Sequence, residues 1–504
     1  MTNFTRRSLL AGGLAAFSAA GLPPQLAPSA AAAPSLRALF HLTPTSGWLC
    51  DPQRPIHAGG KYHLYYLKSD QNNAPGWWQH ATTTDGVTFT DAGVAIPLGP
   101  NFPAWTGSLV VDENNTAGFG AGTIVALATR PTGGDRFDQE QYLYYSHDGG
   151  YTFTAYGAPV IDNPDHSDWF RDPKIHWDSA HHRWAAVIGR FQSAVFYTST
   201  DLVHWTYRST FTYTPPNIGG FECPDLFEME ADDGTWHWIL GASMQGNYSG
   251  KPDTYAYWPG YFDGTTYHPD SRDPQWLDWG FDYYAAVTWP SQDAPRTKRF
   301  AIAWMNNWQY AARSVPTDAS DGYNGQMSVV RQLTLARQPG GWCTLLSQPI
   351  SSLADHAWRR VTIPDQTVNG STVLPYTGRA YQLQLDVSWS AAANVGLSVG
   401  RSPDGGRRTN IGVFQGSVYV DRRASEQSAY SFGSFGQCTA PIDPAARHVR
   451  FRALVDRQSV EVFVNAGFTV LSNQVYFGPD DTGVSLYTDG GPATFTGITV
   501  DEIR

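Results

Sequence analysis

Three short stretches of the sequence each place a carboxylate among proline and aromatic residues. They are Trp48-Leu49-Cys50-Asp51-Pro52, Arg171-Asp172-Pro173 and Glu222-Cys223-Pro224-Asp225. Burying a carboxylate in such surroundings is costly unless its charge is used, and paired carboxylic groups are the usual equipment for cutting a glycosidic bond. A single Asp-Pro is a common turn dipeptide. The three stretches together predict an active site built from loops at one end of a scaffold.

The same stretches resemble the motifs of glycoside hydrolase family 32, which contains invertases, inulinases and levanases. The first family motif usually reads Trp-Met-Asn-Asp-Pro-Asn-Gly, and it appears here as residues 48–54, Trp-Leu-Cys-Asp-Pro-Gln-Arg. The Arg-Asp-Pro and Glu-Cys motifs are intact, and Phe-Ser-Gly-Ser appears as Trp105-Thr106-Gly107-Ser108. Similar stretches at 78–81, 277–285, 304–308 and 456–465 extend the resemblance over nearly the whole mature chain.

The resemblance implies roles for the three carboxylates. Asp51 would be the nucleophile and Glu222 the general acid and base. Asp172 would hold the hydroxyls of the sugar and stabilise the transition state without forming a bond. In retaining enzymes of this kind the two reacting groups lie about 5 Å apart and a covalent glycosyl-enzyme forms. Arg171 could bind the sugar or brace a carboxylate.

The other candidates for sugar contacts are aromatic and polar residues in the motif stretches. A flat tryptophan ring could pack against the C–H face of a sugar, although such rings also dominate protein cores. Glutamine and threonine could supply the polar contacts. The candidate substrate-binding residues are Trp48, Gln53, Trp78, Gln79, Trp105, Thr106, Arg171 and Trp308.

Departures from the family pattern bear on the substrate. Cys50 stands where most members carry asparagine, and residues 65–70, Tyr-Tyr-Leu-Lys-Ser-Asp, replace the common Phe-Tyr-Gln-Tyr-Asn-Pro. This variant pattern resembles the branch of bacterial levan fructotransferases and levan-degrading β-fructofuranosidases, which implies a β-2,6-linked fructan as substrate. Alternatives are intramolecular transfer that releases difructose dianhydride, a non-catalytic fructan-binding propeller, and an inverting enzyme acting on arabinan. Retention of all three carboxylates argues against the binding protein.

A weak repeat indicates the scaffold that positions these residues. An aspartate, usually followed by glycine, recurs between aromatic or β-branched segments at Asp85, Asp148, Asp201 and Asp263. This is a hairpin signal, and the spacing of about 60 residues suits a four-stranded propeller blade. The family resemblance also implies five blades.

The region after the repeats has a different pattern. Apolar and polar residues alternate in 379–400, 409–421 and 447–477, which predicts an antiparallel sandwich. We therefore expect an all-β protein, with a five-bladed β-propeller catalytic domain over residues 36–345 and a β-sandwich domain over residues 356–504.

Composition and the N-terminus indicate the compartment. The chain has 504 residues and a formal net charge of −11, which argues against a nucleic-acid or anionic-membrane partner. Residues 5–10, Thr-Arg-Arg-Ser-Leu-Leu, precede a short apolar run and an alanine-rich stretch. This pattern is typical of a twin-arginine export signal over residues 1–35. It predicts a secreted protein, with no membrane contact in the mature form and a fructan polysaccharide or oligosaccharide as partner.

The cysteines and histidines give no sign of a metal site. The 14 histidines lack zinc-like spacing, so we expect neither a metal nor a cofactor. Cys50 and Cys223 lie beside the predicted catalytic groups, either as free thiols or as a disulfide, and Cys343 and Cys438 could pair. The sequence leaves the pairing and the oligomeric state open.

Overall fold

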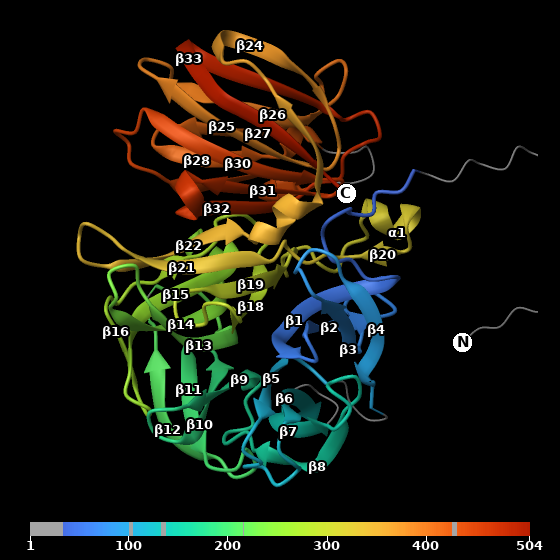
Figure 1. Ribbon diagram of the computed structural model, residues 1–504, viewed down its shortest axis with the longest axis vertical. Coiled ribbons are helices and arrows are strands. Elements are labelled where there is room, and N and C mark those ends of the chain that lie inside the picture. Colours follow the sequence, from blue (N-terminus) through green and yellow to red (C-terminus); the bar gives the residue numbers. More distant parts are fainter. Residues whose placement is uncertain (1–33, 100–103, 133–137, 215, 426–430) are drawn as a thin grey trace, which may run out of the picture. The chain divides into compact units, whose positions relative to one another are not determined.

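The computed structural model describes residues 34–99, 104–132, 138–214, 216–425 and 431–504. The predicted export signal therefore lies almost entirely outside the described residues. The described chain is nearly all β, as predicted, and consists of five propeller blades followed by a C-terminal sandwich (Figure 1).

The first three blades are four-stranded antiparallel sheets in sequence order. They consist of β1 (Gly47–Ala58), β2 (Lys61–Ser69), β3 (Trp77–Thr83) and β4 (Thr90–Ile96); β5 (Gly107–Asp112), β6 (Thr123–Thr132), β7 (Asp138–Ser146) and β8 (Thr154–Ile161); and β9 (Arg171–Asp178), β10 (Arg183–Arg190), β11 (Ser193–Ser199) and β12 (Thr206–Thr212). The first strand of each blade lies innermost, because β1, β5 and β9 contact one another in turn.

The last two blades complete the ring. They consist of β13 (Glu222–Glu230), β14 (Trp236–Gln245), β15 (Asp253–Phe262) and β16 (Tyr267–Pro269), with β17 (Gln275–Trp276) beside β15; and β18 (Tyr284–Pro290), β19 (Arg299–Trp304), β21 (Arg331–Arg337) and β22 (Cys343–Pro349). The short strand β20 (Tyr323–Asn324), which lies between β19 and β21 in the chain, pairs in parallel with β1. This pairing ties the fifth blade to the first.

The recurrence of aspartate at one position of the repeat is explained by the turn in which it lies. Each one lies in the turn between the third and fourth strands of its blade, and its Oδ1 accepts backbone N–H bonds from residues two to four positions later. A short carboxylate that binds its own backbone in this way specifies a tight turn. The hairpin interpretation of the repeat is therefore confirmed for four of the blades.

The C-terminal strands form one continuous sheet that folds over on itself. They are β23 (Ala357–Thr362), β24 (Gln366–Thr377), β25 (Tyr381–Trp389), β26 (Asn394–Arg401), β27 (Thr409–Phe414), β28 (Ser417–Asp421), β29 (Gln437–Pro441), β30 (His448–Asp456), β31 (Ser459–Val464), β32 (Thr469–Gln474) and β33 (Gly483–Ile503). The long strand β33 pairs with β26 up to Asp489 and with β25 from Ala493 onward. Gly490 and Gly491, both with positive φ, lie at the switch and allow the bend.

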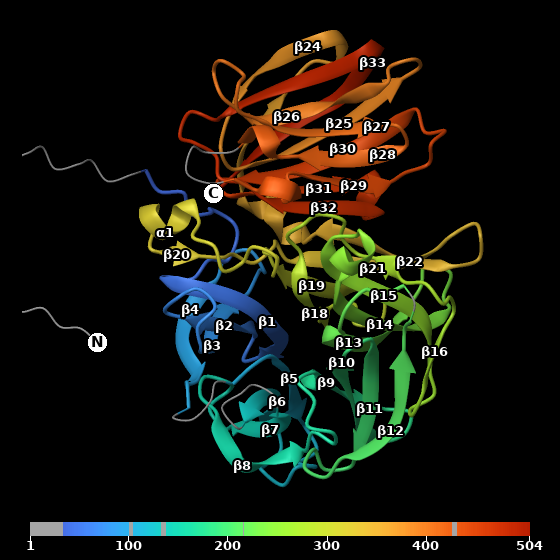
Figure 2. The same ribbon diagram turned by 180° about the vertical axis from the view of Figure 1, so that it is seen from behind.

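The two layers that result are seen from behind in Figure 2, and apolar side chains fill the space between them. Leu383 and Val462 on one layer pack in the same cluster as Val395 and Ile411 on the other. The period-two pattern of the sequence placed these side chains on the inner faces.

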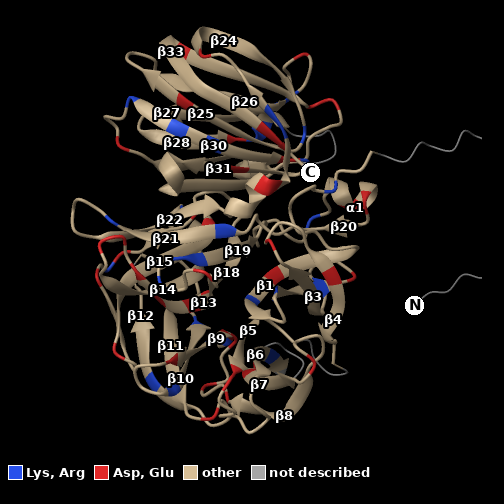
Figure 3. Cartoon of the chain, in the orientation of Figure 1, with Lys and Arg blue, Asp and Glu red and all other residues tan. Residues whose placement is uncertain are grey.

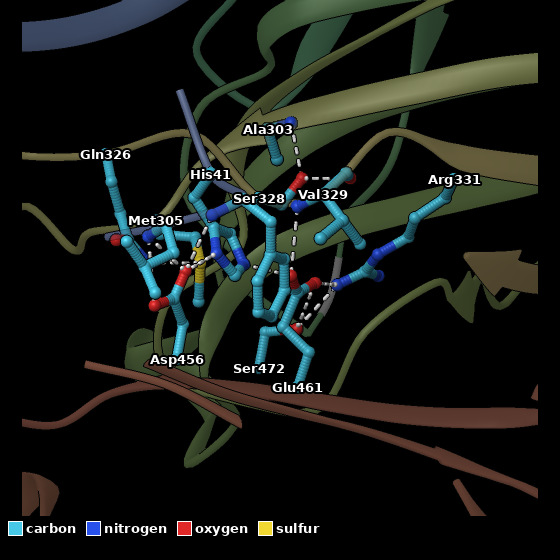
Figure 4. A network of polar contacts seen from close by, with 12 residues as sticks. His41, Ala303, Met305, Gln326, Ser328, Val329, Arg331, Asp456, Glu461 and Ser472 are labelled. Carbon is cyan, nitrogen blue, oxygen red and sulfur yellow. Dashed lines mark hydrogen bonds and ion pairs between the residues drawn. The ribbon is translucent and has the colours of Figure 1, made fainter. Parts of the chain in front are cut away.

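A buried network of charges joins β21 of the propeller to the sandwich (Figure 4). The Arg331 guanidinium donates to Asp278 Oδ2 at 2.9 Å and to Glu461 Oε2 at 2.6 Å, and the side chains of all three residues are fully buried. Ser472 Oγ on β32 also donates to Asp278 Oδ2, at 2.8 Å. Charges buried in this way must be paired to be tolerated.

His41, which precedes the first blade, extends the same network. Its Nδ1 lies 2.8 Å from Asp456 Oδ2 and its Nε2 lies 3.1 Å from Glu461 Oε1. Burial alone would lower the pKa of His41, but the hydrogen bonds and charges of the two carboxylates outweigh it and raise the pKa to about 9. Asp456 and Glu461 therefore brace the propeller rather than face solvent.

Candidate active site

The innermost strands of four blades each begin with a β-bulge, and the three sequence motifs lie at these bulges. The pairing register shifts between Leu49 and Pro52 in β1, between Glu222 and Asp225 in β13, and where β10 opposes the start of β9. The fourth shift follows Tyr284 in β18. Because a bulge redirects the side chains beside it, these strand starts can turn their side chains toward one shared space.

The bulges carry backbone strain. Asp172, Cys223 and Ala285 occupy equivalent bulge positions in three consecutive blades, and their φ angles are 63°, 46° and 51°. Residues other than glycine in this left-handed region cost about 1–3 kcal/mol each and concentrate at functional sites. The strain therefore marks the same end of the propeller as the carboxylates do.

A cavity of about 520 Å³ opens at this end. Asp51, Asp172 and Glu222 all line it, so the three carboxylates that lie far apart in the sequence meet in one place. The size is in the usual range for a ligand site. Much of the remaining wall is apolar and includes Trp48, Leu67, Ala104, Trp105 and Trp308.

Asp51 is held at both carboxylate oxygens. The Cys50 thiol donates to Oδ1 at 3.0 Å, and Thr106 Oγ1 donates to Oδ2 at 2.8 Å. Burial raises the pKa of Asp51 above its usual value, and the two hydrogen bonds oppose part of that shift. Burial also raises the pKa of the Cys50 thiol, so the sulfur keeps the proton that it donates.

Asp172 lies next to Asp51. The backbone N–H of Cys223 donates to Asp172 Oδ2 at 2.9 Å, and the Cys223 sulfur lies 3.8 Å from that oxygen and 4.0 Å from Asp51 Oδ2. Burial raises the pKa of Asp172 to about 7; the charge of Arg171 opposes this shift, and those of Glu222 and Asp51 add to it. A hydroxyl donor that enters the cavity therefore stabilises the charged form of this carboxylate.

Glu222 has a different set of partners. Arg171 Nη2 lies 3.0 Å from its Oε1, and the hydroxyl of Tyr284 and Gln245 Nε2, the latter at 3.3 Å, donate to its Oε2. The Arg171 guanidinium in turn lies 3.8 Å from the centre of the Trp169 ring. Donors on both oxygens fix the orientation of the carboxyl group, as a residue that gives and takes a proton requires.

The structure divides the predicted substrate-binding residues into two groups. Five line the cavity: Trp48, Trp105, Thr106, Arg171 and Trp308. The other three, Gln53, Trp78 and Gln79, are buried and are not among its lining residues.

Each residue of the second group has a local partner. Gln53 donates to the backbone oxygen of Asp51 at 3.0 Å and accepts from the N–H of Gly107 at 2.7 Å. Trp78 Nε1 donates to the backbone oxygen of Trp105 at 2.9 Å, and Gln79 donates to Asp91 at 2.6 Å. Gln53 and Trp78 thus hold the backbone behind cavity residues.

No pattern in the sequence assigns a role to Tyr284, Gln245 or Trp169. Tyr284 lies in a stretch that resembles the family, and that position was the only available signal. Gln245 ends a strand and Trp169 precedes the Arg-Asp-Pro motif, but neither follows a pattern that points to Glu222 or Arg171. Only Tyr284 reaches Glu222 from another blade, whereas Gln245 reaches it from the neighbouring strand of the same blade.

All four cysteines are free and buried. Cys343 lies 3.4 Å from His237 Nε2, and Cys438 lies 3.5 Å from Asn473 Oδ1, so the possible pairing of these two cysteines is not present. Within the described ranges, no cluster of three or more His, Cys, Asp or Glu side chains could hold a metal ion.

The thiol contact to Asp51 can be tested directly. Replacing Cys50 with Ala removes the donor to Oδ1, and we expect kcat to fall about 3- to 30-fold, since a thiol is a weak donor to a charged acceptor. Cys50→Ser restores a donor and should recover most of the rate. Cys343→Ser, remote from the cavity, is the matched control. Unchanged kcat in folded Cys50→Ala would show that the thiol only fills space.

Comparisons with known proteins agree with this geometry. Residues 41–349 match the model of the glycosyl hydrolases family 32 N-terminal domain, and residues 350–502 match the family 32 C-terminal model. A levanbiose-producing levanase of Bacillus subtilis (strain 168) is 46% identical over 476 residues, which cover 93% of this chain and 91% of that protein. An extracellular exo-inulinase of Aspergillus niger is 30% identical over 525 residues, which cover 93% and 94%.

A solved structure supports the fold. The crystal structure of an exo-inulinase from Aspergillus awamori superposes with a TM-score of 0.84 at 26% identity, and the match covers 93% of this chain and 98% of the other.

Proposed function

Because this chain belongs to glycosyl hydrolase family 32, we propose that it cleaves the β-2,6 bonds of levan through a covalent fructosyl-enzyme. It is a glycoside hydrolase that acts on β-fructofuranosyl linkages. The observation that carries the proposal is the meeting of Asp51, Asp172 and Glu222 in one cavity, each with different partners. The 46% identity to a levanbiose-producing levanase favours levan among the fructans.

In the first step, a carboxylate oxygen of Asp51 attacks the anomeric carbon of the fructosyl unit. The bond from that carbon to the bridging oxygen breaks, and Glu222 gives its proton to the departing oxygen. Donors on both oxygens of Asp51 keep the carboxylate in one orientation for the attack, which lowers the entropy that must be lost in the transition state.

In the second step, Glu222 accepts a proton from water, whose oxygen attacks the anomeric carbon. The bond to Asp51 breaks, and fructose or a fructosyl chain is released with its original anomeric configuration. Arg171 and Tyr284 hold Glu222 in position through both steps, since one binds each of its oxygens.

Asp172 acts without forming a bond. Its carboxylate accepts hydrogen bonds from sugar hydroxyls and places negative charge near the oxocarbenium-like carbon. Burial raises its pKa to about 7, and sugar hydroxyls that donate to it oppose this shift because they favour the charged form. Charge on a buried group that is already in place before the reaction is usually a large contribution to catalysis.

Membership in family 32 argues against two of the three alternative functions and leaves the third, intramolecular transfer, open. Family 32 enzymes are retaining glycoside hydrolases, so membership argues against both the inverting arabinan-cleaving enzyme and the non-catalytic binding protein. Intramolecular transfer uses the same fructosyl-enzyme and differs only in which hydroxyl attacks it. We propose hydrolysis, in which water attacks the fructosyl-enzyme, because the relative with 46% identity is a levanase.

We also propose that the protein works outside the cell on a neutral polymer. The N-terminal twin-arginine pattern and the extracellular relative of Aspergillus niger support secretion. No helix in the described residues is both long and apolar enough to cross a bilayer. Lys and Arg residues are scattered over separate strands among more numerous Asp and Glu (Figure 3), a distribution that suits an uncharged substrate.

Levan should be the preferred substrate. We expect kcat/KM on levan to exceed that on inulin and on sucrose by about tenfold or more. In the cavity wall, Cys50, Leu67 and Lys68 stand where most of the family carries other, polar residues, and the loss of a hydrogen-bonding partner changes discrimination between substrates by about 1–3 kcal/mol. The three substrates are compared under one condition, and products are separated by chromatography. A higher value on sucrose would contradict the assignment to levan. Difructose dianhydride as the main product would show transfer instead of hydrolysis.

A further inference from the structure

We propose that a strip of four side chains, Trp105, Arg171, Trp169 and Phe191, is the track on which the leaving part of the levan chain lies. The strip begins in the cavity and ends on the protein surface. The inference rests on the proposed function, since it concerns the polymer that the site would cleave. It assigns to Trp169 and Phe191 a binding role beyond the residues that contact the reacting sugar.

The four side chains form a continuous series. The Arg171 guanidinium lies 6.0 Å from the centre of the Trp105 ring and 3.8 Å from that of Trp169. The Trp169 and Phe191 rings are 5.7 Å apart and nearly perpendicular, at 77°. Trp105 and Arg171 line the cavity, whereas Phe191 is 48% exposed. A sugar chain that leaves the cavity over Arg171 would therefore meet aromatic surface rather than bare solvent.

The outer part of the strip is held in a fixed position. Trp169 packs so closely on Gly220 that a Cβ at that glycine would lie 1.9 Å from the indole. Phe191 forms an antiparallel bridge with the same glycine, and the N–H of Phe221 donates to the backbone oxygen of Arg190 at 3.0 Å. Gly220 and Phe221 lead directly into Glu222. The strip and the proton donor thus share one piece of backbone, and a rigid aromatic platform binds with little loss of entropy.

The proton donor decides which part of the substrate the strip holds. Glu222 gives its proton to the bridging oxygen, so the leaving part of the chain lies on the Glu222 side of the broken bond. Arg171, in the middle of the strip, is paired with Glu222 at 3.0 Å. The first leaving fructose would lie near Arg171 and Trp105, and later units would extend over Trp169 toward Phe191.

Exposure alone would not single out Phe191. Large exposed hydrophobic residues are common on protein surfaces, and an isolated one needs no explanation. Tyr207 on β12 is also exposed, at 53%, and its ring packs against Tyr197 on the neighbouring strand β11. Phe191 differs from Tyr207 because it is joined through Trp169 and Arg171 to the residues that surround the scissile bond.

The test compares long and short substrates. In Phe191→Ala, the ratio of kcat/KM on high-molecular-mass levan to kcat/KM on β-2,6 oligosaccharides of two or three units should fall about three- to tenfold, the range that one aromatic contact supplies. The loss should appear mainly in KM for levan. Phe191→Trp keeps a ring at the position and should retain the wild-type ratio. Tyr207→Ala, an exposed aromatic residue outside the strip, is the matched control.

The outcomes separate this inference from the proposed function. Equal losses on long and short substrates, or no loss in a folded Phe191→Ala variant, would overturn the track while the enzyme remained a levanase. A wild-type protein that fails to cleave levan would contradict the proposed function itself. Thermal unfolding of each variant, measured beside Tyr207→Ala, shows whether a lost rate reflects lost structure.

Discussion

Replacing Asp51 or Glu222 with alanine should lower kcat on levan by a factor of about 10² to 10⁴ or more, the contribution typical of a nucleophile or of a general acid and base. Asp51→Ala cannot form the fructosyl-enzyme, and Glu222→Ala can neither protonate the leaving oxygen nor activate water. The measurement is kcat on levan at saturating substrate, with thermal unfolding recorded on the same samples.

The fold should survive both substitutions. Burial raises the pKa of Asp51, which means that the folded protein holds this charge at a cost, and Asp51→Asn should unfold at the same or a higher temperature than the wild type. Either alanine variant keeping more than a tenth of wild-type kcat, with unchanged unfolding, would refute the role given to that residue.

A small anionic nucleophile distinguishes the two roles. On an activated substrate whose leaving group departs without protonation, azide, which needs no base, should attack the fructosyl-enzyme of Glu222→Ala and restore part of its turnover with retained configuration. It should not do so in Asp51→Ala, where no fructosyl-enzyme forms. Azide that takes the place of the missing carboxylate in Asp51→Ala would give a product of inverted configuration, so a retained product from Asp51→Ala and an inverted one from Glu222→Ala would mean that the two roles are exchanged.

The second large effect concerns stability and lies at the junction of propeller and sandwich. Arg331→Met should destabilise the protein by about 3–5 kcal/mol, because it leaves Asp278 and Glu461 charged, buried and without their cation. All three side chains are fully buried. The measurement is the thermal or denaturant midpoint of unfolding, and kcat of the variant that remains folded at low temperature should change little.

An exposed ion pair supplies the matched control. Arg359 lies 3.1 Å from Glu502 in the sandwich, but its side chain is 56% exposed. Such surface pairs contribute about 0–1 kcal/mol, so Arg359→Met should scarcely move the midpoint. Equal midpoint shifts in the two variants would show that the buried network has no special part in stability.

The same network predicts how stability depends on pH. The pKa of His41 is raised to about 9. The stability that its charged form adds to the fold is therefore complete below the ordinary pKa of about 6.5 and is lost as the pH rises through 9. The pKa of Glu461 is lowered to about 2, where the attraction of Arg331 and His41 outweighs burial. Its contribution is complete above about 4.5 and is lost as the pH falls. The junction should be most stable between about pH 4.5 and 6.5, and His41→Gln should remove the alkaline loss.

Local sequence patterns determined the features whose causes are local. The aspartate of each repeat binds N–H groups within four residues of itself, and a turn of this kind can be read from the sequence wherever it occurs. Alternation along the C-terminal strands predicted the faces that enclose the sandwich core, since successive side chains in a strand point to opposite faces. The three carboxylates were identified because the chemistry needs those residue types within recognisable motifs.

Tertiary packing decided which residues reach the cavity and what each one touches. Gln53 is only two residues from Asp51, yet Asp51 lies within the bulge between Leu49 and Pro52, whereas Gln53 follows it and is buried against backbone. Trp48 and Trp78 lie in similar motif stretches, but only Trp48 lines the cavity. Tyr284 and Arg171 bind Glu222 from two other blades. No period in the sequence encodes contacts of that kind, because they depend on how whole sheets pack.

The network between the domains is the clearest case. His41 binds Asp456 and Glu461 across more than 400 positions of the chain, and Arg331 reaches Glu461 from the fifth blade. The alternating pattern around Glu461 predicted a strand but could not show that its outward face would be covered. A carboxylate on such a face stays in water unless another layer brings a cation to it, and only the folded chain supplies that layer.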